Sequence, residues 1–392
     1  MKHFHPPQAK KNDQTKQPLW IARVEGRSAF RKFIRLPWSL YGDDPMWVPP
    51  LLIERKQHLS PRNPYFAHAQ YCSWIAYRGV HPVGRISAQV DELHIQRYRD
   101  ATGFFGMIEA EDDATTFRAL TETAEQWLRG KGMRRILGPL NFSLNQECGL
   151  LVEGFDTPPS IMMGHARRYY APRIEEQGYR KEKDLLAYLV NTDFAWPPVV
   201  RKIIARARHD LRLRPLCRSR FTEDLETLRT IFNDAWSQNW GFIPFTRPEF
   251  QQLGQDIKYL ADKELVQIAE VNGSPAGMIV VLPNLNEVIR DLNGRLFPFG
   301  WIKLLWRLKV RHPGSARIPL MGVCRRYQGS LLGSAIAFKL IDAVRGPGVR
   351  RGIREVEMSW ILEDNMRIRT IIESIGGNVY KRYRIYGKEL YE

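Results

Sequence analysis

Residues 317–337 read RIPLMGVCRRYQGSLLGSAIA, and this stretch decides the fold. It begins with an apolar run typical of a strand, passes through a turn that contains Gly329 and Gly333, and ends in an apolar helical pattern. Amides at the beginning of a helix are free to donate hydrogen bonds, and the positive end of the helix dipole favours an anion there. The stretch therefore predicts a strand, a phosphate-binding loop and a helix, although an ordinary turn before a helix is the alternative.

The sequence on both sides of this loop predicts a mixed sheet. Asn272-Gly273 lies between two alternating apolar runs, which is a strong signal for a hairpin. Strands are expected at 265–270, 276–282, 317–323, 354–361 and 378–386, and helices at 223–236, 329–345 and 365–375. Because strands and helices alternate after the hairpin, we expect an α/β fold, of the α+β kind with a mixed sheet.

A weak internal repeat predicts that this unit occurs twice. Residues 76–87, AYRGVHPVGRIS, resemble residues 269–280, AEVNGSPAGMIV, at an offset close to half of the 392-residue chain. Pro197 and Pro198 hold the backbone extended and favour a linker. We therefore expect a disordered tail at 1–18, a first domain at 19–193, a linker at 194–198 and a second domain at 199–392.

The loop, the strand VEMSWI and the helix that begins at Asn365 resemble the acyl-CoA-binding unit of the GNAT superfamily of N-acyltransferases. In that superfamily the loop reads Gln or Arg, Gly, any residue, Gly, an aliphatic residue, then Gly or Ala. Leu331 departs from this pattern because it replaces a glycine. The resemblance implies two tandem GNAT-like domains and acyl-CoA as the co-substrate.

The resemblance also assigns residues to acyl-CoA, either in the loop or at the end of the preceding strand. They are Gly322, Val323, Gln328, Gly329, Ser330, Leu332, Gly333 and Asn365. The backbone amides near Gly322 and Val323 would stabilise the tetrahedral intermediate. Ile372 stands where many members have a tyrosine that acts as the general acid, so the usual acid is missing.

The first domain matches the superfamily less well. FFGMIEAEDDATTFRAL, from Phe104, has a strand and a helix, but Glu111, Asp112 and Asp113 lie between them. These carboxylates would repel an anion and instead stabilise the beginning of the helix. We expect a degenerate GNAT-like domain there and one active site per chain.

A basic, aromatic insertion at 284–315 predicts contact with a membrane. It contains GRLFPFGWIKLLWRLKVRH, and a helix there would carry cations every fourth residue beside apolar side chains. The net charge of +17 also favours an anionic surface. A solvated helix packed on the domain, or single-stranded nucleic acid, is the alternative, and we expect no nucleic acid partner. The expected membrane contacts are Trp301, Lys303, Trp306, Arg307 and Arg311.

Three further stretches resemble the GNAT-related bacterial ceramide synthases: NFSLNQECGLLVEGFDTPP from Asn141, FNDAWSQNWGFIPF from Phe232 and SWILEDN from Ser359. This resemblance implies that acyl-CoA acylates the amine of a long-chain sphingoid base. The polar side chains would bind the headgroup between the two domains, although turn chemistry also explains asparagines of this kind. The expected substrate residues are Asn141, Asn145, Asn239 and Trp240.

Carboxylates after one predicted strand are candidates for catalysis. A long-chain amine is mostly protonated at neutral pH, so a base must remove a proton before the amine attacks a thioester. Glu363 is the leading candidate, and Asp364 is either a second candidate or a helix N-cap. Tyr383 on the last strand is the candidate acid, although an aromatic strand residue is more often part of the core.

Composition limits the remaining alternatives. The longest stretch without a charged residue, 271–286, contains two prolines, and the first eighteen residues lack the apolar core of a signal peptide. We therefore expect a cytoplasmic protein, peripheral at the inner face of the membrane. The four cysteines are far apart, so no metal site is predicted. Three functions remain: acylation of a lipid amine, acylation of a peptide or protein amine, and non-enzymatic binding to membrane or nucleic acid.

Overall fold

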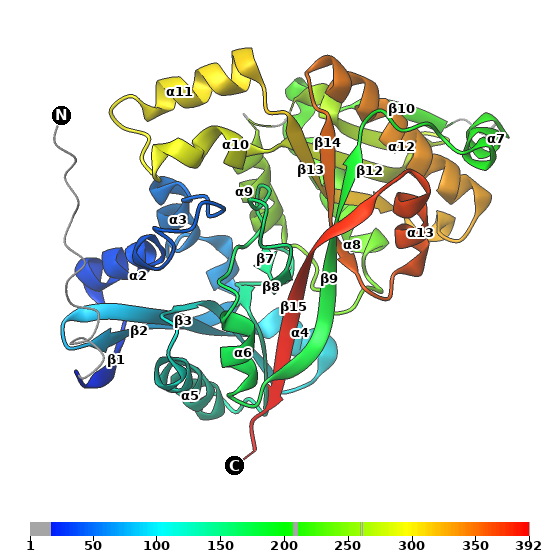
Figure 1. The fold of residues 1–392 in the computed structure, drawn as a ribbon. Helices are drawn as coiled ribbons and strands as arrows, with labels where there is room; N and C mark the ends of the chain where they lie inside the picture. Colours follow the sequence, from blue (N-terminus) through cyan, green and yellow to red (C-terminus); the bar gives the residue numbers. More distant parts are fainter. Residues whose placement is uncertain (1–16, 207–210, 259, 261, 392) are drawn as a thin grey trace, which may run out of the picture.

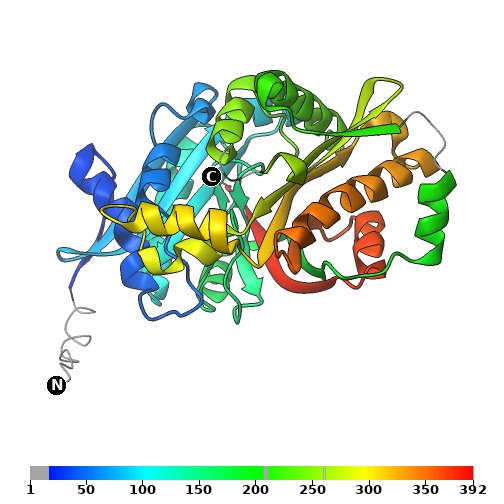
Figure 2. The ribbon, with the colours of Figure 1, turned by 90° about the horizontal axis from the view of Figure 1, so that it is seen from above.

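The structure is a computed structural model that describes residues 17–206, 211–258, 260 and 262–391. All but two residues of the expected tail at 1–18 lie outside the described residues. The described chain forms one large mixed sheet with helices on its faces (Figure 1), so the predicted α/β class is confirmed. Seen from above, the two halves of the chain lie side by side, and strands of the sheet run through both (Figure 2).

The first half contributes nine strands. In chain order they are β1 (Leu19–Arg23), β2 (Ala69–Arg78), β3 (His81–Asp91), β4 (Thr102–Ala110), β5 (Arg135–Gly138), β6 (Leu140–Asn141), β7 (Glu147–Cys148), β8 (Leu150–Glu153) and β9 (Arg180–Asn191). Its helices are α2 (Gly26–Leu40), α3 (Leu52–His58), α4 (Glu92–Tyr98), α5 (Ala114–Gly130) and α6 (Tyr170–Glu175).

The second half contains every element that the sequence predicted. Its strands are β10 (Leu211–Pro215), β11 (Val266–Val271), β12 (Ser274–Pro283), β13 (Ser315–Val323), β14 (Glu355–Leu362) and β15 (Asn378–Glu389). Its helices are α7 (Pro198–Arg206), α8 (Phe221–Ala235), α9 (Arg247–Ile257), α10 (Leu285–Ile289), α11 (Gly300–Trp306), α12 (Leu331–Arg350) and α13 (Met366–Ser374).

The two halves pair their strands in the same order and exchange their last strands. β1 to β4 pair antiparallel in sequence and β4 pairs parallel with β5, and β10 to β14 repeat this scheme. β15 then pairs with β5 of the first half, and β9 pairs with β14 of the second. β9 and β15 also pair with each other along the middle of the molecule (Figure 1). The domain limits at 19–193 and 199–392 stay a prediction.

Two hydrophobic layers cover the sheet of the second half. Strand β12 alternates, so that Ile279 packs with α12 on one face and Met278 packs with α8 on the other. α12 runs past the predicted end at 345 to Arg350 and includes Pro347, and Gly348 in this last part is buried. Among the described helices, none combines the length and the apolar character needed to cross a membrane.

Candidate active site

The strands β13 and β14 stop pairing before their carboxyl ends, and this separation of the two strands is called the opening below. They pair in parallel only from Ser315 to Ile318 on β13 and from Glu355 to Met358 on β14. Beyond that point β13 pairs with β12 alone, and β14 pairs with β9 alone. Ligands of α/β sheets bind at such carboxyl ends, so the opening is the natural place for a site.

The predicted phosphate loop connects this opening to the N-terminus of α12. Gln328 donates through Nε2 to the carbonyl oxygens of Val323, at 2.8 Å, and Ala235, at 2.9 Å, which ties the loop to β13 and α8. The Ser330 hydroxyl caps α12 by accepting from the amide of Gly333 at 3.0 Å. A Cβ on Gly333 would overlap the carbonyl oxygen of Tyr327, so only glycine fits there.

Two amides of β13 face the opening. The Cys324 amide donates to the Ala276 carbonyl on β12. Because the direction of the backbone amide and carbonyl alternates along a strand, those of Gly322 also point toward β12, whereas those of Met321 and Val323 point away from it. The Met321 carbonyl accepts from Nε1 of Trp236 at 3.1 Å, and the Val323 carbonyl accepts from Gln328. Their amides therefore remain at the unpaired edge of β13. The sequence assignment included Val323 but missed Met321, which alternation along the strand could have indicated.

Three arginines surround the loop, and none of them was among the residues predicted from the sequence to bind acyl-CoA. Arg325 and Arg326 belong to the loop, and Arg326 donates to the Pro275 carbonyl at 3.0 Å. Arg367 comes from α13, and its Nη1 lies 3.6 Å from the place that a Cβ on Gly329 would take. All three side chains are exposed, so the loop combines helix-end amides with a positive field.

Glu363 and Asp364 lie at the end of β14, and both are paired with lysines of β9. Glu363 accepts from Nζ of Lys181 at 2.6 Å and from the amide of Asp184 at 3.1 Å. Asp364 accepts from Nζ of Lys183 at 2.9 Å, which lowers the pKa of Asp364. The N-cap of α13 is Asn365, whose Oδ1 accepts from the Ile368 amide at 3.3 Å. The role of Glu363 as a base stays a prediction.

The other catalytic candidate, Tyr383, lies inside the hydrophobic core of the first half. Its side chain is fully buried, and its hydroxyl donates to the Gly164 carbonyl at 3.3 Å. Burial raises the pKa of Tyr383 well above its ordinary value. Tyr383 therefore has the surroundings of a core residue, which was the alternative expected for an aromatic residue on a strand.

The structure brings the two predicted substrate loops together. Nδ2 of Asn145 donates to the Ile243 carbonyl at 2.8 Å, close to Asn239 and Trp240 in the same loop. Trp240 is half-buried against the first-half core, and Nζ of Lys183 lies 5.8 Å from its ring centroid. The polar stretches of the two halves therefore meet beside β9.

Asn141 lies in the first half's counterpart of the opening and helps to fill it. β4 and β5 pair in parallel over only three residues each, and then diverge like β13 and β14. Oδ1 of Asn141 accepts from the Met107 amide at 2.8 Å, and a Cβ on Gly106 would overlap the Leu140 carbonyl. The chain's own backbone thus lies against the separated strands of the first half.

The acidic stretch after β4 is neutralised within the protein. Arg78 donates to Glu111 and to Asp113, each at 2.6 Å. The Asp113 carboxylate also accepts from the Thr116 amide at 2.7 Å and caps α5, as the sequence predicted. Asp112 pairs with Arg173 at 2.8 Å.

A buried polar network closes the base of the opening in the second half. Arg317, only 1% exposed, donates from Nε to the Ser359 hydroxyl at 2.9 Å and from Nη1 to the Ile161 carbonyl at 3.0 Å. The Ser359 hydroxyl donates to Glu357 at 2.5 Å, and Tyr380 donates to the same carboxylate. Burial lowers the pKa of Arg317 and raises that of Tyr380. No spacing pattern in the sequence predicts this network.

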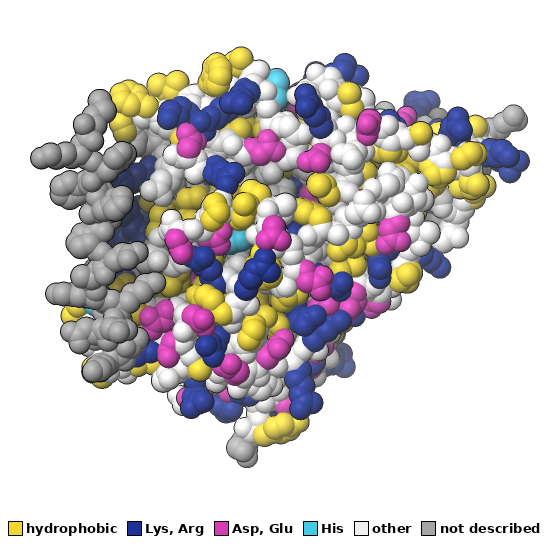
Figure 3. Space-filling view, in the orientation of Figure 1, with side chains coloured by type: hydrophobic (Ala, Val, Ile, Leu, Met, Phe, Trp, Pro, Cys, Tyr) yellow, Lys and Arg dark blue, Asp and Glu magenta, His cyan; other side chains and the backbone are white. Residues whose placement is uncertain are grey.

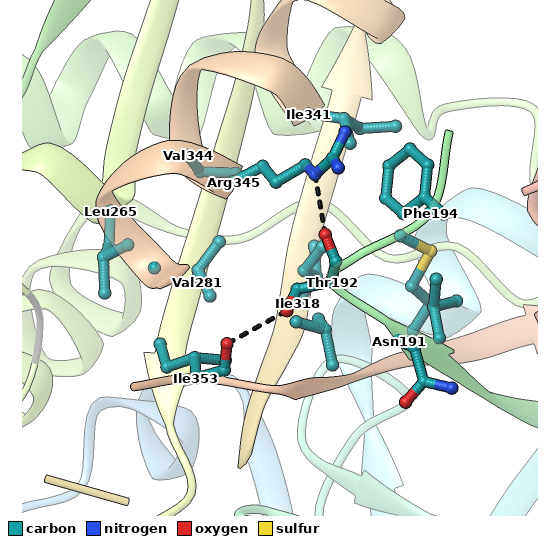
Figure 4. Close-up of a pocket in the computed structure, with 14 residues that line it drawn as sticks. Asn191, Thr192, Phe194, Leu265, Val281, Ile318, Ile341, Val344, Arg345 and Ile353 are labelled. Carbon is teal, nitrogen blue, oxygen red and sulfur yellow. Dashed lines mark hydrogen bonds between the residues drawn. The ribbon is translucent and has the colours of Figure 1, made fainter. Parts of the chain in front are cut away.

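A small apolar pocket of about 40 Å³ lies between α12 and the strands β9, β12, β13 and β14 (Figure 4). Ile318 and Met358, the last paired residues of β13 and β14, belong to its wall. The chain after β9 covers it: Nε of Arg345 donates to the Thr192 carbonyl at 2.7 Å, and its guanidinium lies 4.2 Å from the Phe194 ring. A pocket with this lining suits an alkyl group.

The predicted helix of the insertion exists as α11, extended by a π-helical segment, Arg307–Arg311. Leu304 and Leu308 pack against the core beneath it, whereas Trp301 and Trp306 are 44% and 54% exposed. Hydrophobic side chains gather over α11 with Lys and Arg side chains close by (Figure 3). Lys303 and Arg311 are exposed, but Arg307 is held by Asp291, with 2.9 Å between Nη2 and Oδ2.

Two curated relatives resemble the chain over nearly its whole length, and no family model matches it. It is 49% identical to "Protein YghO" of Escherichia coli (strain K12) over 365 residues, which cover 93% of this chain and 94% of the relative. It is 45% identical to "Bacterial ceramide synthase" of Caulobacter vibrioides over 381 residues, which cover 96% of this chain and 99% of the relative.

Solved structures share the fold at low sequence identity. The chain matches a tandem GNAT protein from the clavulanic acid biosynthesis pathway with a TM-score of 0.54 and 12% identity, over 96% of this chain and 99% of the other. It matches a GCN5-related N-acetyltransferase from Sphaerobacter thermophilus with a TM-score of 0.51 and 13% identity, over 97% of each chain. The tandem GNAT-like fold that the sequence implied is therefore confirmed.

Proposed function

The chain belongs to the family of GNAT-related acyltransferases that includes the bacterial ceramide synthase of Caulobacter vibrioides, and from this premise we propose that it acylates the amine of a long-chain lipid base with acyl-CoA at a membrane surface. The observation that carries the proposal is the opening between β13 and β14, with the free amides of Met321 and Val323 at its edge. The relatives support the acyltransferase class, and the geometry supports the place of reaction.

We place acyl-CoA in the second half. The beginning of α12 offers free amides, and Arg325, Arg326 and Arg367 add positive charge around Gly329, which suits a pyrophosphate. In the first half Asn141 and its neighbours fill the corresponding opening, and Glu111 and Asp113 lie where phosphates would be. One acyl-CoA per chain follows from this difference.

The reaction we propose forms an amide and breaks a thioester. The neutral amine attacks the thioester carbonyl, and the oxygen that becomes negative accepts from the amides of Met321 and Val323. Collapse of the tetrahedral intermediate expels the thiolate of coenzyme A, which takes up a proton. Before the attack the protonated amine loses one proton to Glu363, directly or through a water, and Glu363 must exchange its bond with Lys181 to accept it. The second proton, which the nitrogen loses in the tetrahedral intermediate, passes to the departing thiolate.

We place the lipid amine between the two halves. The loops around Asn145 and Asn239 meet beside β9 and supply polar groups from both halves. Asn141 positions this region indirectly, because both ends of its amide are bonded within the protein. A hydroxylated headgroup would satisfy polar groups that are half-buried there.

Contact with the membrane would come from α11. Its exposed side chains, Trp301, Ile302, Leu305 and Trp306, project away from the protein, while Leu304 and Leu308 anchor the helix. Aromatic and cationic residues of this kind favour the boundary of an anionic leaflet, where each Lys or Arg contributes about 1 kcal/mol.

Reconstitution tests the proposal directly. Purified protein, a long-chain acyl-CoA and a sphingoid base in vesicles of phosphatidylcholine and phosphatidylglycerol should yield free thiol and an N-acyl lipid of the summed mass. Parallel reactions with a peptide amine test the alternative acceptor. Amide formation on the peptide but not on the lipid base would contradict the lipid substrate and retain the acyltransferase.

A further inference from the structure

A half-open cavity of about 650 Å³ lies beside the insertion, at the end of β13 opposite to the opening. It is bordered by α10, by the π-helical segment after α11 and by the turn that precedes β13. Its charged lining consists of Glu287, Arg290, Asp291, Arg307, Arg311 and His312. None of these residues takes part in the site between β13 and β14.

The two carboxylates of the cavity are already used within the protein. Glu287 accepts from the backbone amides of Gly314 and Ser315, each at 2.9 Å, and so holds the turn before β13. Asp291 accepts from Arg307 in a two-pronged pair. Asp291 also lies 3.9 Å from Nζ of Lys303, so both carboxylates are engaged by groups other than Arg290 and Arg311.

Two arginines of the cavity keep uncompensated charge. Arg290 donates only to a neutral partner, the Pro45 carbonyl, and Arg311 is exposed. Within the described part of the chain, neither has a carboxylate within ion-pair distance. His312 adds ring nitrogens that can donate or accept at the same wall. The cavity therefore offers a concave, cationic lining to an anion.

The cavity lies directly beside the apolar surface of the insertion. Phe297 and Phe299, 75% and 68% exposed, precede α11, and hydrophobic side chains gather over that helix (Figure 3). If this surface enters the headgroup boundary, the cavity reaches the depth of the lipid phosphates. We propose that it binds the phosphate of one anionic phospholipid headgroup. This proposal depends on the membrane contact of the proposed function, but it does not depend on the acyl transfer.

Titration with a dispersed lipid separates a defined site from diffuse attraction. Monomeric dihexanoyl phosphatidylglycerol should bind the protein saturably in isothermal titration, and Arg311→Gln should weaken binding about tenfold, since it removes a charge-assisted hydrogen bond. Arg295→Gln is the matched control, because Arg295 is an exposed cation of the same insertion outside the cavity lining. It should change this affinity less than about twofold.

Three results would overturn the site. They are the absence of saturable binding to the monomeric lipid, equal losses in Arg311→Gln and Arg295→Gln, and inorganic phosphate binding as tightly as the lipid, which would indicate a site for free phosphate. The transferase activity is tested separately, by measuring turnover of a detergent-dispersed sphingoid base with wild-type protein and no phospholipid. If that reaction failed, the proposed function would be contradicted, but the binding result for the headgroup site would still hold.

Discussion

Arg317 on β13 and Glu357 on β14 are partners in the strand register, one residue before the two strands separate, and both side chains are almost completely buried. Nε of Arg317 lies 3.5 Å from Oε1 of Glu357, and the Ser359 hydroxyl bridges them. Arg317 also holds the Ile161 carbonyl of the first half. The pair therefore fixes both the base of the opening and the contact between the halves.

Removing one member of this pair should destabilise the protein strongly. Arg317→Met leaves Glu357 as an uncompensated buried charge, which costs about 3–5 kcal/mol. Glu357→Met leaves Arg317 uncompensated, at a similar cost. The double variant should be less destabilised than the sum of the single variants, because no charge is left alone. Urea denaturation of the four proteins measures this, and additive losses would contradict the coupling.

The Gly333 position should control binding of coenzyme A. In Gly333→Ala the new methyl group would overlap the Tyr327 carbonyl, so the loop must shift away from α12 and affinity should fall at least about tenfold. Gly346→Ala in the same helix meets only the flexible end of Arg350 and serves as the control. Unchanged affinity in Gly333→Ala would place acyl-CoA elsewhere in the chain.

The elements around this loop could be predicted because their signals are local. Asn272-Gly273 marks the hairpin, and glycines and apolar periodicity mark β13 and α12 within a few residues. The exchange of β9 and β15 has no such signal, since it depends on pairing between strands from opposite halves. The sequence therefore predicted two domains side by side, and not their interlocked sheet.

The candidate site was less predictable for the same reason. Glu363 was correctly placed after a strand, but its partner Lys181 comes from β9, which reaches it only through the exchange. Arg367 approaches Gly329 from another helix, and Arg317 meets Glu357 across two strands. Charged groups brought together by topology leave no spacing pattern in the sequence.

Membrane binding should depend on the exposed tryptophans of α11. Trp301→Ser with Trp306→Ser removes apolar area from the outward face without touching Leu304 or Leu308, so the fold should remain and vesicle binding should fall about tenfold or more. Trp20→Ser removes a tryptophan of similar exposure, 48%, from β1. Equal vesicle sedimentation of both variants would contradict a special role for α11.

His68 should make the contact between the halves depend on pH. Although burial alone would lower the pKa of His68, a hydrogen bond with Asp91 of β3 and an ion pair with Glu249 of α9 raise it to about 10. The unfolded pKa is 6.5, so this stabilisation is complete below about pH 6.5 and is lost as pH rises through 10. His68→Gln should therefore lower the free energy of unfolding at pH 6 and have little effect near pH 10.5. A constant difference across this range would contradict the linkage.

Turnover should depend on Glu363 if it accepts the proton of the amine. Glu363→Gln keeps the size of the side chain and should lower kcat about a hundredfold, with little change in the affinity for acyl-CoA. Raising the pH should restore part of the rate, because more of the amine is then already neutral. A purely structural carboxylate would instead cost stability, without recovery at high pH.

Asp364→Asn is the matched control for that experiment, because Asp364 is the next residue and is also paired with a lysine of β9. Its ion pair is more exposed, with 62% of the Asp364 side chain accessible, so its loss should cost little stability and little rate. Thermal melting of both variants separates unfolding from lost chemistry. If Glu363→Gln is stably folded and retains full turnover, Glu363 is not the base. A large loss confined to Asp364→Asn would then transfer the role to Asp364, the second candidate predicted from the sequence.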